Sequence, residues 1–375
     1  MSDHRPDEQI SAFLAERIAA GDFPSAVYLV GVGAAARLSD ALGDAVRTGS
    51  DTERATLETI YDLASLTKPL VTGLLAARRI ESGEFALVDR IARFLPEFDC
   101  EDKRSITLGQ LLTHTSGLPA WRPLYLTTGG DRARTLQAIA HEPLDYAPGT
   151  RVLYSDLGFI TLGILLERLA GVSLADIARR EIFEPLELRR TFFNPNRELR
   201  AVIAASEMGN HYEQQMSSGK ETPAGYSWRE HLIWGEVHDG NAYFLGGAAG
   251  HAGLFSTAPE TQRLAAQFLP RQTRLLKPQT CALFRADMTA GLAEARSLAW
   301  QLAATPDSTA GQSLAPDSFG HLGFTGTSCW IDPDKERIYI LLTNRTHAHT
   351  LPFVNINSVR RRFHTLAAAR LDSLD

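Results

Sequence analysis

The chain has 375 residues, of which 44% are hydrophobic and 22% charged, so it has enough apolar material for a large core. Its formal net charge is −6, with no long run of one sign, which argues against nucleic acid or an anionic membrane surface as the main partner. No apolar run approaches the ~20 residues that a membrane span needs. The one basic cluster, residues 360–362, is interpreted as the solvated face of a helix.

The start of the chain and its cysteines indicate the cellular compartment in which the protein is expected. Residues 1–21 are polar and acidic, without the basic start and apolar stretch of a secretory signal. Cys100, Cys281 and Cys329 lie far apart and have neither metal-ligand spacing nor the pattern of a disulfide framework. We therefore expect a cytoplasmic protein, or a periplasmic one if a leader was removed.

The first quarter of the chain predicts two helices and two strands. Residues 7–20 have the apolar spacing of a helix, and residues 26–33 have the continuous apolar character of a buried strand. A second strand is expected around 43–48. Residues 66–80 predict a helix that ends at Ser82 and Gly83.

The middle of the chain, about 90–235, is mainly helical in pattern. Thr107 and Gln110 form a capping-box pattern, and a helix is predicted over 157–170. Residues 206–230 are polar and predict a long loop. Beyond this region the pattern predicts a helix, two strands and a final helix, at about 258–269, 323–331, 337–343 and 354–371.

Strands therefore lie at both ends of the chain, and helices fill the middle. Because strands and helices do not alternate regularly, a doubly wound parallel sheet is not expected. The pattern favours an α+β fold with a discontinuous domain, residues 1–90 plus 240–375. A mainly helical domain, residues 91–239, is inserted into it.

One short motif suggests nucleophilic chemistry. Ser65 and Lys68 are three residues apart in SLTK, where an apolar run passes into the predicted helix. A helix would place the two side chains on one face, and its N-terminus favours a developing negative charge. A plain polar helix start is the alternative, and a second match, Ser217 to Lys220 in a polar stretch, shows that the pattern alone is weak.

Two further stretches could complete such a site. A serine hydroxyl needs a base, which can be a lysine of lowered pKa or a tyrosinate held ionised by cations. Tyr154 precedes a helix in APGTRVLYSDLG, where it could instead be a capping aromatic. His321 lies in FGHLGFTGTS, whose glycines would let a substrate backbone approach an edge strand.

Together these motifs resemble the serine β-lactamase and penicillin-binding-protein superfamily, in its class C-like branch. SLTK resembles the S-x-x-K motif, Tyr154-Ser155-Asp156 resembles Y-x-N, and His321-Leu322-Gly323 resembles K-T-G. ITLGQLLTHTSGLP, GHAGLFST and GFTGTSCWIDP support the resemblance. It implies an antiparallel sheet flanked by helices with an inserted helical domain, and an activity among carboxypeptidases, β-lactamases, esterases and other acyl-transferring hydrolases.

The resemblance also implies a mechanism. Ser65 would form an acyl-enzyme, with Tyr154 and Lys68 passing its proton to the leaving group. The oxyanion hole would be the backbone N–H groups of Ser65 and Phe324, and water would release the acyl group. No metal or organic cofactor is required. The expected partner is a small acyl compound, and whether Lys68 or Tyr154 is the dominant base stays open.

Three residues depart from the family pattern. Asp156 stands in place of an asparagine amide and should hold Lys68 more firmly in its charged form, although it could simply cap the following helix. His321 replaces a permanent cation with a group that titrates near pH 6.5, so a substrate carboxylate should lose a partner as pH rises. Leu322 removes a threonine hydroxyl. Asp156, His321 and Gly323 are the candidate substrate-binding residues, and weak β-lactam hydrolysis is expected.

Several other histidines and acidic residues have structural interpretations. His321 could be an ordinary strand histidine, and His114 is expected to close a helix before a turn. His238, Asp239 and His251 have no metal-ligand spacing and are expected at the pocket rim or in the loop network. The rival function is a sensor module of the same fold that binds, or acylates without turnover.

Overall fold

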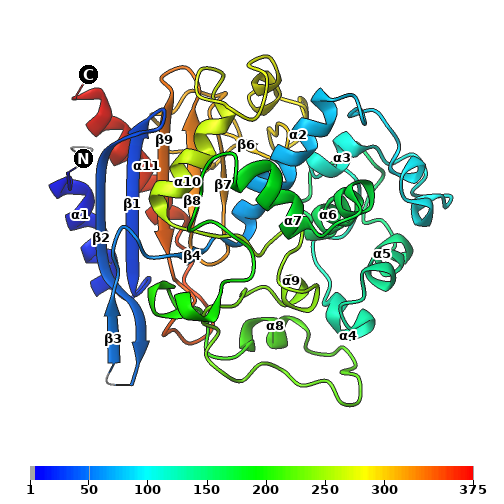
Figure 1. Ribbon diagram of the computed structural model, residues 1–375, viewed down its shortest axis with the longest axis horizontal. Helices are drawn as coiled ribbons and strands as arrows, with labels where there is room; N and C mark the ends of the chain where they lie inside the picture. Colours follow the sequence, from blue (N-terminus) through cyan, green and yellow to red (C-terminus); the bar gives the residue numbers. More distant parts are fainter. Residues whose placement is uncertain (1–4, 50, 375) are drawn as a thin grey trace.

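In the computed structural model, which describes residues 5–49 and 51–374, one antiparallel sheet of seven strands joins the two ends of the chain (Figure 1). The strand order is β3-β2-β1-β9-β8-β7-β6. The strands are β1 (Ser25–Val32), β2 (Ala35–Thr48), β3 (Asp51–Arg54), β6 (Gln301–Leu302), β7 (Phe319–Leu322), β8 (Ser328–Asp332) and β9 (Arg337–Thr343). A separate pair consists of β4 (Tyr61–Asp62) and β5 (Phe255–Ser256).

The centre of the sheet explains the apolar runs in the sequence. β1 and β9 are neighbours, with Tyr28 opposite Leu341, and all seven residues of β9 are buried. A strand covered on both faces needs apolar side chains at nearly every position, so it shows no alternation. This pairing confirms the predicted antiparallel sheet flanked by helices.

Helices cover both faces of the sheet and fill the other half of the molecule. Figure 1 shows α1 and α11 together on one face, where Tyr28, Trp330 and Phe363 share a core cluster, while α10 packs on the other face. The helices are α1 (Glu8–Ala19), α2 (Leu74–Glu81), α3 (Leu108–Leu112), α4 (Leu124–Thr128), α5 (Arg132–His141), α6 (Asp156–Ala170), α7 (Leu174–Ala178), α8 (His211–Met216), α9 (Gly240–Phe244), α10 (Ala258–Ala265) and α11 (Asn357–Asp372).

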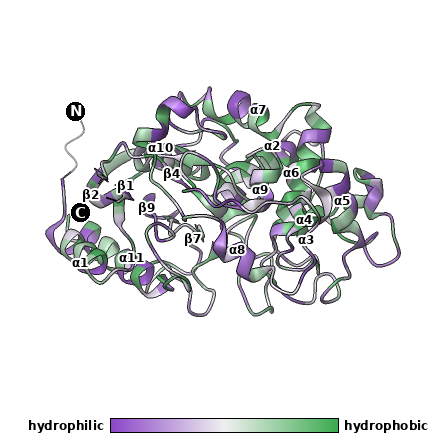
Figure 2. Cartoon of the chain, turned by 90° about the horizontal axis from the view of Figure 1, so that it is seen from below, coloured by the Kyte–Doolittle hydropathy of each residue, from purple (hydrophilic) through white to green (hydrophobic). Residues whose placement is uncertain are grey.

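α6 is the central helix of the helical half. All its residues from Leu157 to Leu166 are buried, and Figure 2 shows its strongly hydrophobic character. In the part of the chain that is described, no single helix is long and apolar enough to cross a bilayer. Only α6 joined to Leu174–Phe183 across a 74° bend meets that criterion.

The helix expected over 66–80 is wrong in its first half. Ala64–Leu66 forms a 3₁₀ turn and Lys68–Gly73 a π-helical segment, and the α-helix begins only at Leu74. Pro69 is the physical reason, because it has no N–H to bond the carbonyl of Ser65 four residues earlier. Lys68 nevertheless lies close to Ser65, with 2.9 Å between Nζ and Oγ.

Three other expectations need correction. The strand expected over 323–331 begins only with β8 at Ser328. The residues before it form a turn that contains Gly326 (φ 112°) and follows the end of β7 at Leu322. The polar loop over 206–230 contains a helix, α8. Arg360 lies on a buried face of α11 rather than a solvated one, and donates to the carbonyl oxygens of Gly323 and Thr327 at 2.6 and 2.9 Å.

A glycine contact between α6 and the turn before β5 should be critical for stability. A Cβ atom on Gly163 would lie 2.7 Å from the backbone N of Gly250, so one element must shift. In an ordinary helix Gly→Ala is stabilising. We predict that Gly163→Ala instead lowers the free energy of unfolding, by about 1–3 kcal/mol, as overpacking does.

Gly158→Ala on the same helix is the matched control, since its Cβ would meet nothing closer than 3.6 Å. Urea denaturation should show it neutral or stabilising. Equal stability of the two variants would contradict the predicted clash.

Candidate active site

The proposed nucleophile follows a strained residue. Ala64 has φ 48°, a left-handed conformation that costs energy for a residue with a side chain. Its N–H donates to Asp62 Oδ1 at 2.8 Å, and its carbonyl accepts from Thr67 Oγ1 at 2.6 Å. These two bonds hold the turn that places Ser65 on the wall of a cavity of about 650 Å³.

Lys68 is the buried charge beside Ser65. Its side chain has no solvent exposure, and its Nζ lies 2.9 Å from Ser65 Oγ and 2.7 Å from Asp156 Oδ1. Nζ also donates to the carbonyl oxygen of His251 at 3.1 Å. Burial disfavours its charged form, but Asp156 and Tyr154 outweigh that effect, so the pKa of Lys68 is raised. The site therefore holds an ammonium group at neutral pH.

Asp156 lies in the first turn of α6 without being its cap. The cap is Ser155, whose Oγ accepts the N–H of Gly158 at 3.2 Å. The interpretation of Asp156 as the helix cap is therefore wrong. Its carboxylate instead pairs with Lys68, in agreement with the expected effect on the lysine charge.

Tyr154 lies over Lys68 and is held by His114. Nζ of Lys68 is 4.8 Å from the centre of the tyrosine ring, and the centre of the His114 ring is 4.6 Å from it, with the two rings tilted by 33°. Burial raises the pKa of the Tyr154 hydroxyl, although Lys68 opposes this, so the phenol is protonated at neutral pH. His114 Nδ1 accepts the N–H of Ser155 at 3.0 Å, so His114 supports the tyrosine in addition to ending its helix.

His321 lines the cavity, but its expected titration near pH 6.5 is wrong. Its side chain is only 4% exposed, and burial, followed by the charges of Lys68 and Arg296, lowers its pKa well below 6.5. Nδ1 lies 2.9 Å from the carbonyl oxygen of Leu322, which assigns the ring proton to Nδ1. His321 therefore presents a neutral acceptor nitrogen, and a substrate carboxylate has no cationic partner there to lose.

The two candidate oxyanion donors lie on the same cavity. Ser65 and Phe324 both line it, and neither backbone N–H donates a hydrogen bond within residues 5–49 and 51–374. Gly323 lets the end of β7 approach the nucleophile turn, because a Cβ there would lie 2.5 Å from the carbonyl oxygen of Leu63 and would collide with Thr327. The glycine thus makes room for the protein's own backbone.

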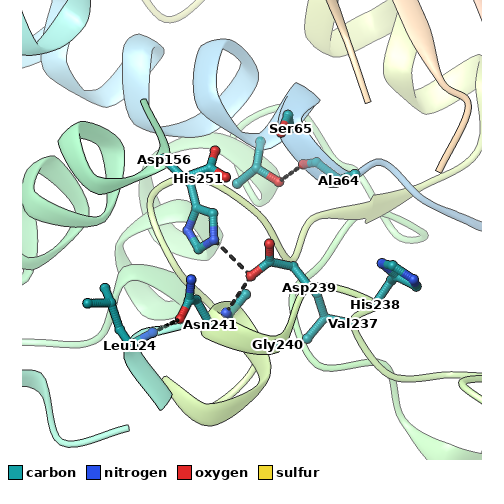
Figure 3. A network of polar contacts seen from close by, with 12 residues as sticks. Ala64, Ser65, Leu124, Asp156, Val237, His238, Asp239, Gly240, Asn241 and His251 are labelled. Carbon is teal, nitrogen blue, oxygen red and sulfur yellow. Dashed lines mark hydrogen bonds and ion pairs between the residues drawn. The ribbon is translucent and has the colours of Figure 1, made fainter. Parts of the chain in front are cut away.

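Two histidine–carboxylate pairs contain the residues whose role the sequence does not decide, His238, Asp239 and His251. His251 Nε2 lies 2.8 Å from Asp239 Oδ1 (Figure 3), and His238 Nε2 lies 2.8 Å from Glu207 Oε2. The first pair supports Lys68, since the carbonyl oxygen of His251 accepts from its Nζ. No group of three or more histidine, cysteine or acidic residues within the described ranges could hold a metal.

Sequence reasoning missed Arg296. Its guanidinium lies 5.7 Å from the centre of the Tyr154 ring, pairs with Glu294 at 2.7 Å, and lines the cavity. It belongs to an irregular segment without helical or strand pattern, so the sequence contains no signal for its position.

Known proteins are similar to this chain over most of its length. The family model described as Beta-lactamase matches residues 10–359. The chain belongs to the Beta-lactamase family. A protein of Escherichia coli (strain K12), provisionally named a D-alanyl-D-alanine carboxypeptidase, is 31% identical over 322 residues, which cover 79% of this chain and 71% of the relative.

Solved structures show the same fold at low sequence identity. EstCE1, described as a hydrolase with promiscuous acyltransferase activity, is similar with a TM-score of 0.71 and 22% identity, over 95% of this chain and 97% of its own. A penicillin-binding protein homologue from Caulobacter crescentus has a TM-score of 0.70 and 19% identity, over 97% and 98%. Both confirm the predicted fold class.

Asp156 should control the protonation of Lys68. Removing its charge in Asp156→Asn leaves burial as the main influence, so the pKa of Lys68 should fall. We predict that the rate at which a fluorophosphonate labels Ser65 stays level in the wild-type protein up to about pH 10, where free lysine titrates. In Asp156→Asn the rate should decline at lower pH. Superimposable pH profiles would refute this role of Asp156.

Proposed function

We propose that this member of the Beta-lactamase family is a serine hydrolase that acts through an acyl-enzyme on Ser65. The observation that carries the proposal is the 2.9 Å distance between Lys68 Nζ and Ser65 Oγ, with Asp156 fixing the lysine from the other side. An ammonium at hydrogen-bond distance stabilises the serine oxygen as it gains negative charge.

Acylation then needs a proton carrier rather than a permanent base. Ser65 Oγ attacks the acyl carbon and passes its proton to the Tyr154 oxygen, while Tyr154 gives its own proton to the leaving group. The Oγ–carbon bond forms and the bond to the leaving group breaks, so Tyr154 ends as it began. This relay is consistent with a raised pKa at Tyr154 and a charged Lys68. The backbone N–H groups of Ser65 and Phe324 would donate hydrogen bonds to the carbonyl oxygen of the substrate.

Hydrolysis of the acyl-enzyme would run the same relay in reverse, with water in place of the leaving group. Water gives a proton to Tyr154, Tyr154 returns its proton to Ser65, and the acid product leaves. No metal or organic cofactor enters either step. Lys68 keeps its proton throughout, which makes Tyr154 the proton carrier in both halves.

The proposed substrates are small esters, amides or D-amino-acid peptides. Similarity to the Escherichia coli relative supports the peptide class. Efficient β-lactam hydrolysis is not expected. Asp156 cannot donate an amide hydrogen bond, neutral His321 offers no cation, and Leu322 offers no hydroxyl.

A module that acylates without turnover is the second candidate. Asp156 and Leu322 favour it, because both depart from the family motifs while Ser65 is kept. Both candidate functions predict that an acylating probe labels Ser65. Only the hydrolase predicts repeated release of product.

Active-site labelling and turnover test the proposal together. A fluorophosphonate probe should label the wild-type protein and not Ser65→Ala, whereas Ser217→Ala, which alters the chance S-x-x-K match, should label normally. p-Nitrophenyl esters should be turned over many times per enzyme, and nitrocefin far more slowly. Labelling that persists in Ser65→Ala would refute the nucleophile. A single stoichiometric burst of nitrophenol would favour the acylating module.

A further inference from the structure

Arg360 carries a buried charge that the proposed relay does not use. It lies in the first turn of α11, is 5% exposed and lines the same cavity as Ser65. Burial, followed by the charge of Arg345, lowers the pKa of Arg360 to about 9, so the guanidinium is still charged at neutral pH. In the described part of the chain its hydrogen-bond acceptors are Asn357 Oδ1 and two backbone carbonyl oxygens, none of them a carboxylate. A buried charge without a counterion destabilises the fold, so a role in stability alone does not account for Arg360.

The two carbonyl groups belong to the turn between β7 and β8. Nη2 of Arg360 donates to the carbonyl oxygen of Gly323 at 2.6 Å and to that of Thr327 at 2.9 Å. The carbonyl of Gly323 and the N–H of Phe324 belong to one trans peptide group, in which they point in opposite directions. Arg360 therefore holds one end of the peptide whose other end is the proposed oxyanion donor.

The next peptide group along the turn is held by a second arginine. Nε of Arg345 donates to the carbonyl oxygen of Phe324 at 2.7 Å, and the backbone N–H of Arg345 donates to the carbonyl oxygen of Thr325 at 2.9 Å. Its guanidinium also lies 4.7 Å from the centre of the Phe324 ring. Both peptide groups that flank the Cα atom of Phe324 are thus fixed at their carbonyl oxygens by a cationic side chain.

Two buried threonines join this turn to the nucleophile segment. Thr325 Oγ1 donates to the carbonyl oxygen of Asp62 at 2.7 Å, and Thr327 Oγ1 donates to that of Leu63 at 3.0 Å. Because Asp62 and Leu63 lead directly into the turn that carries Ser65, the two segments that supply the proposed oxyanion donors have a fixed relative position.

We propose that Arg360 is a positioning residue of the oxyanion hole and acts through the peptide group between Gly323 and Phe324. As the acyl oxygen of the substrate becomes negative, the N–H of Phe324 donates to it, and the carbonyl oxygen of Gly323 gains negative charge. The guanidinium stabilises this charge, since consecutive hydrogen bonds polarise one another and a charged donor forms the stronger bond. This inference rests on the proposed acyl-enzyme chemistry at Ser65 and deepens it.

The rate at which a neutral alkyl fluorophosphonate labels Ser65 tests this role. Phosphonylation also places negative charge on an oxygen in the oxyanion hole, and it requires no turnover. Arg360→Met should lower the maximal labelling rate by about tenfold to a hundredfold, because an oxyanion donor acts in the transition state. The probe concentration that gives the half-maximal rate should stay the same. Arg362→Met, an exposed position on the same helix, is the matched control and should label at the wild-type rate.

Two further variants separate the charge of Arg360 from structural support of the turn. Arg360→Lys keeps the positive charge, whereas Arg360→Gln keeps an N–H donor without the charge. Arg360→Lys should retain most of the maximal labelling rate, and Arg360→Gln should be nearly as slow as Arg360→Met. Urea denaturation should show all of these variants folded under the labelling conditions.

Three outcomes would overturn the role of Arg360. Equal maximal rates in the wild-type protein and Arg360→Met would remove it. Arg360→Gln labelling as fast as Arg360→Lys would make the residue a structural support only. A change in the half-maximal probe concentration alone would indicate a direct contact with the probe.

Labelling in Ser65→Ala distinguishes failure of this inference from failure of the proposed function. If any of the three outcomes occurs while Ser65→Ala abolishes labelling, the proposed nucleophile stands and the role of Arg360 alone fails. Labelling that persists in Ser65→Ala would refute both.

Discussion

The buried ion pair between Lys68 and Asp156 is the constraint on which the site depends. Lys68 comes from the turn after β4 and Asp156 from the first turn of α6, so the pair joins the nucleophile segment to the helical half of the molecule. Losing one partner of such a pair typically costs about 3–5 kcal/mol, because the other charge stays buried. The glycine contact between α6 and the turn that carries His251 holds the same parts together.

The positive charge of Lys68 organises the ionisation of its neighbours. It opposes protonation of His114 and His321, in which burial already favours the neutral ring. It also partly offsets the effect of burial on Tyr154. The result is one ion pair, Lys68 with Asp156, beside neutral groups that can carry or accept a proton. A concerted relay suits this arrangement better than a permanently ionised tyrosine does, since no charge beyond the Lys68–Asp156 pair has to be kept in the low-dielectric interior.

The sequence predicted those features that local pattern controls. The continuous apolar runs marked β1 and β9, and Thr107 with Gln110 forms the capping box that the pattern indicated. The order of the motifs predicted that Ser65, Tyr154 and His321 share one site, and all three line the same cavity. These features need only side-chain periodicity or a family pattern.

Features that depend on contacts distant in sequence escaped prediction. Arg360 appears exposed in a basic run, yet it is buried because carbonyl groups of the β7–β8 turn face it. The neutral state of His321 follows from burial beside Lys68, which is 253 positions earlier in the sequence. Arg296 and Glu213 lie in irregular or polar segments, so their place on the cavity wall depends on the tertiary fold alone.

The most direct test of the account is the titration of the Lys68 ammonium by NMR. The chain has five lysines, so isotope-labelled lysine gives few signals, and Lys68→Arg identifies the one that matters. The account predicts that Lys68 titrates above the ordinary lysine range and that this signal moves to lower pH in Asp156→Asn. A Lys68 that is already neutral near pH 7 in the wild-type protein would contradict the charged lysine, and with it the proton relay through Tyr154.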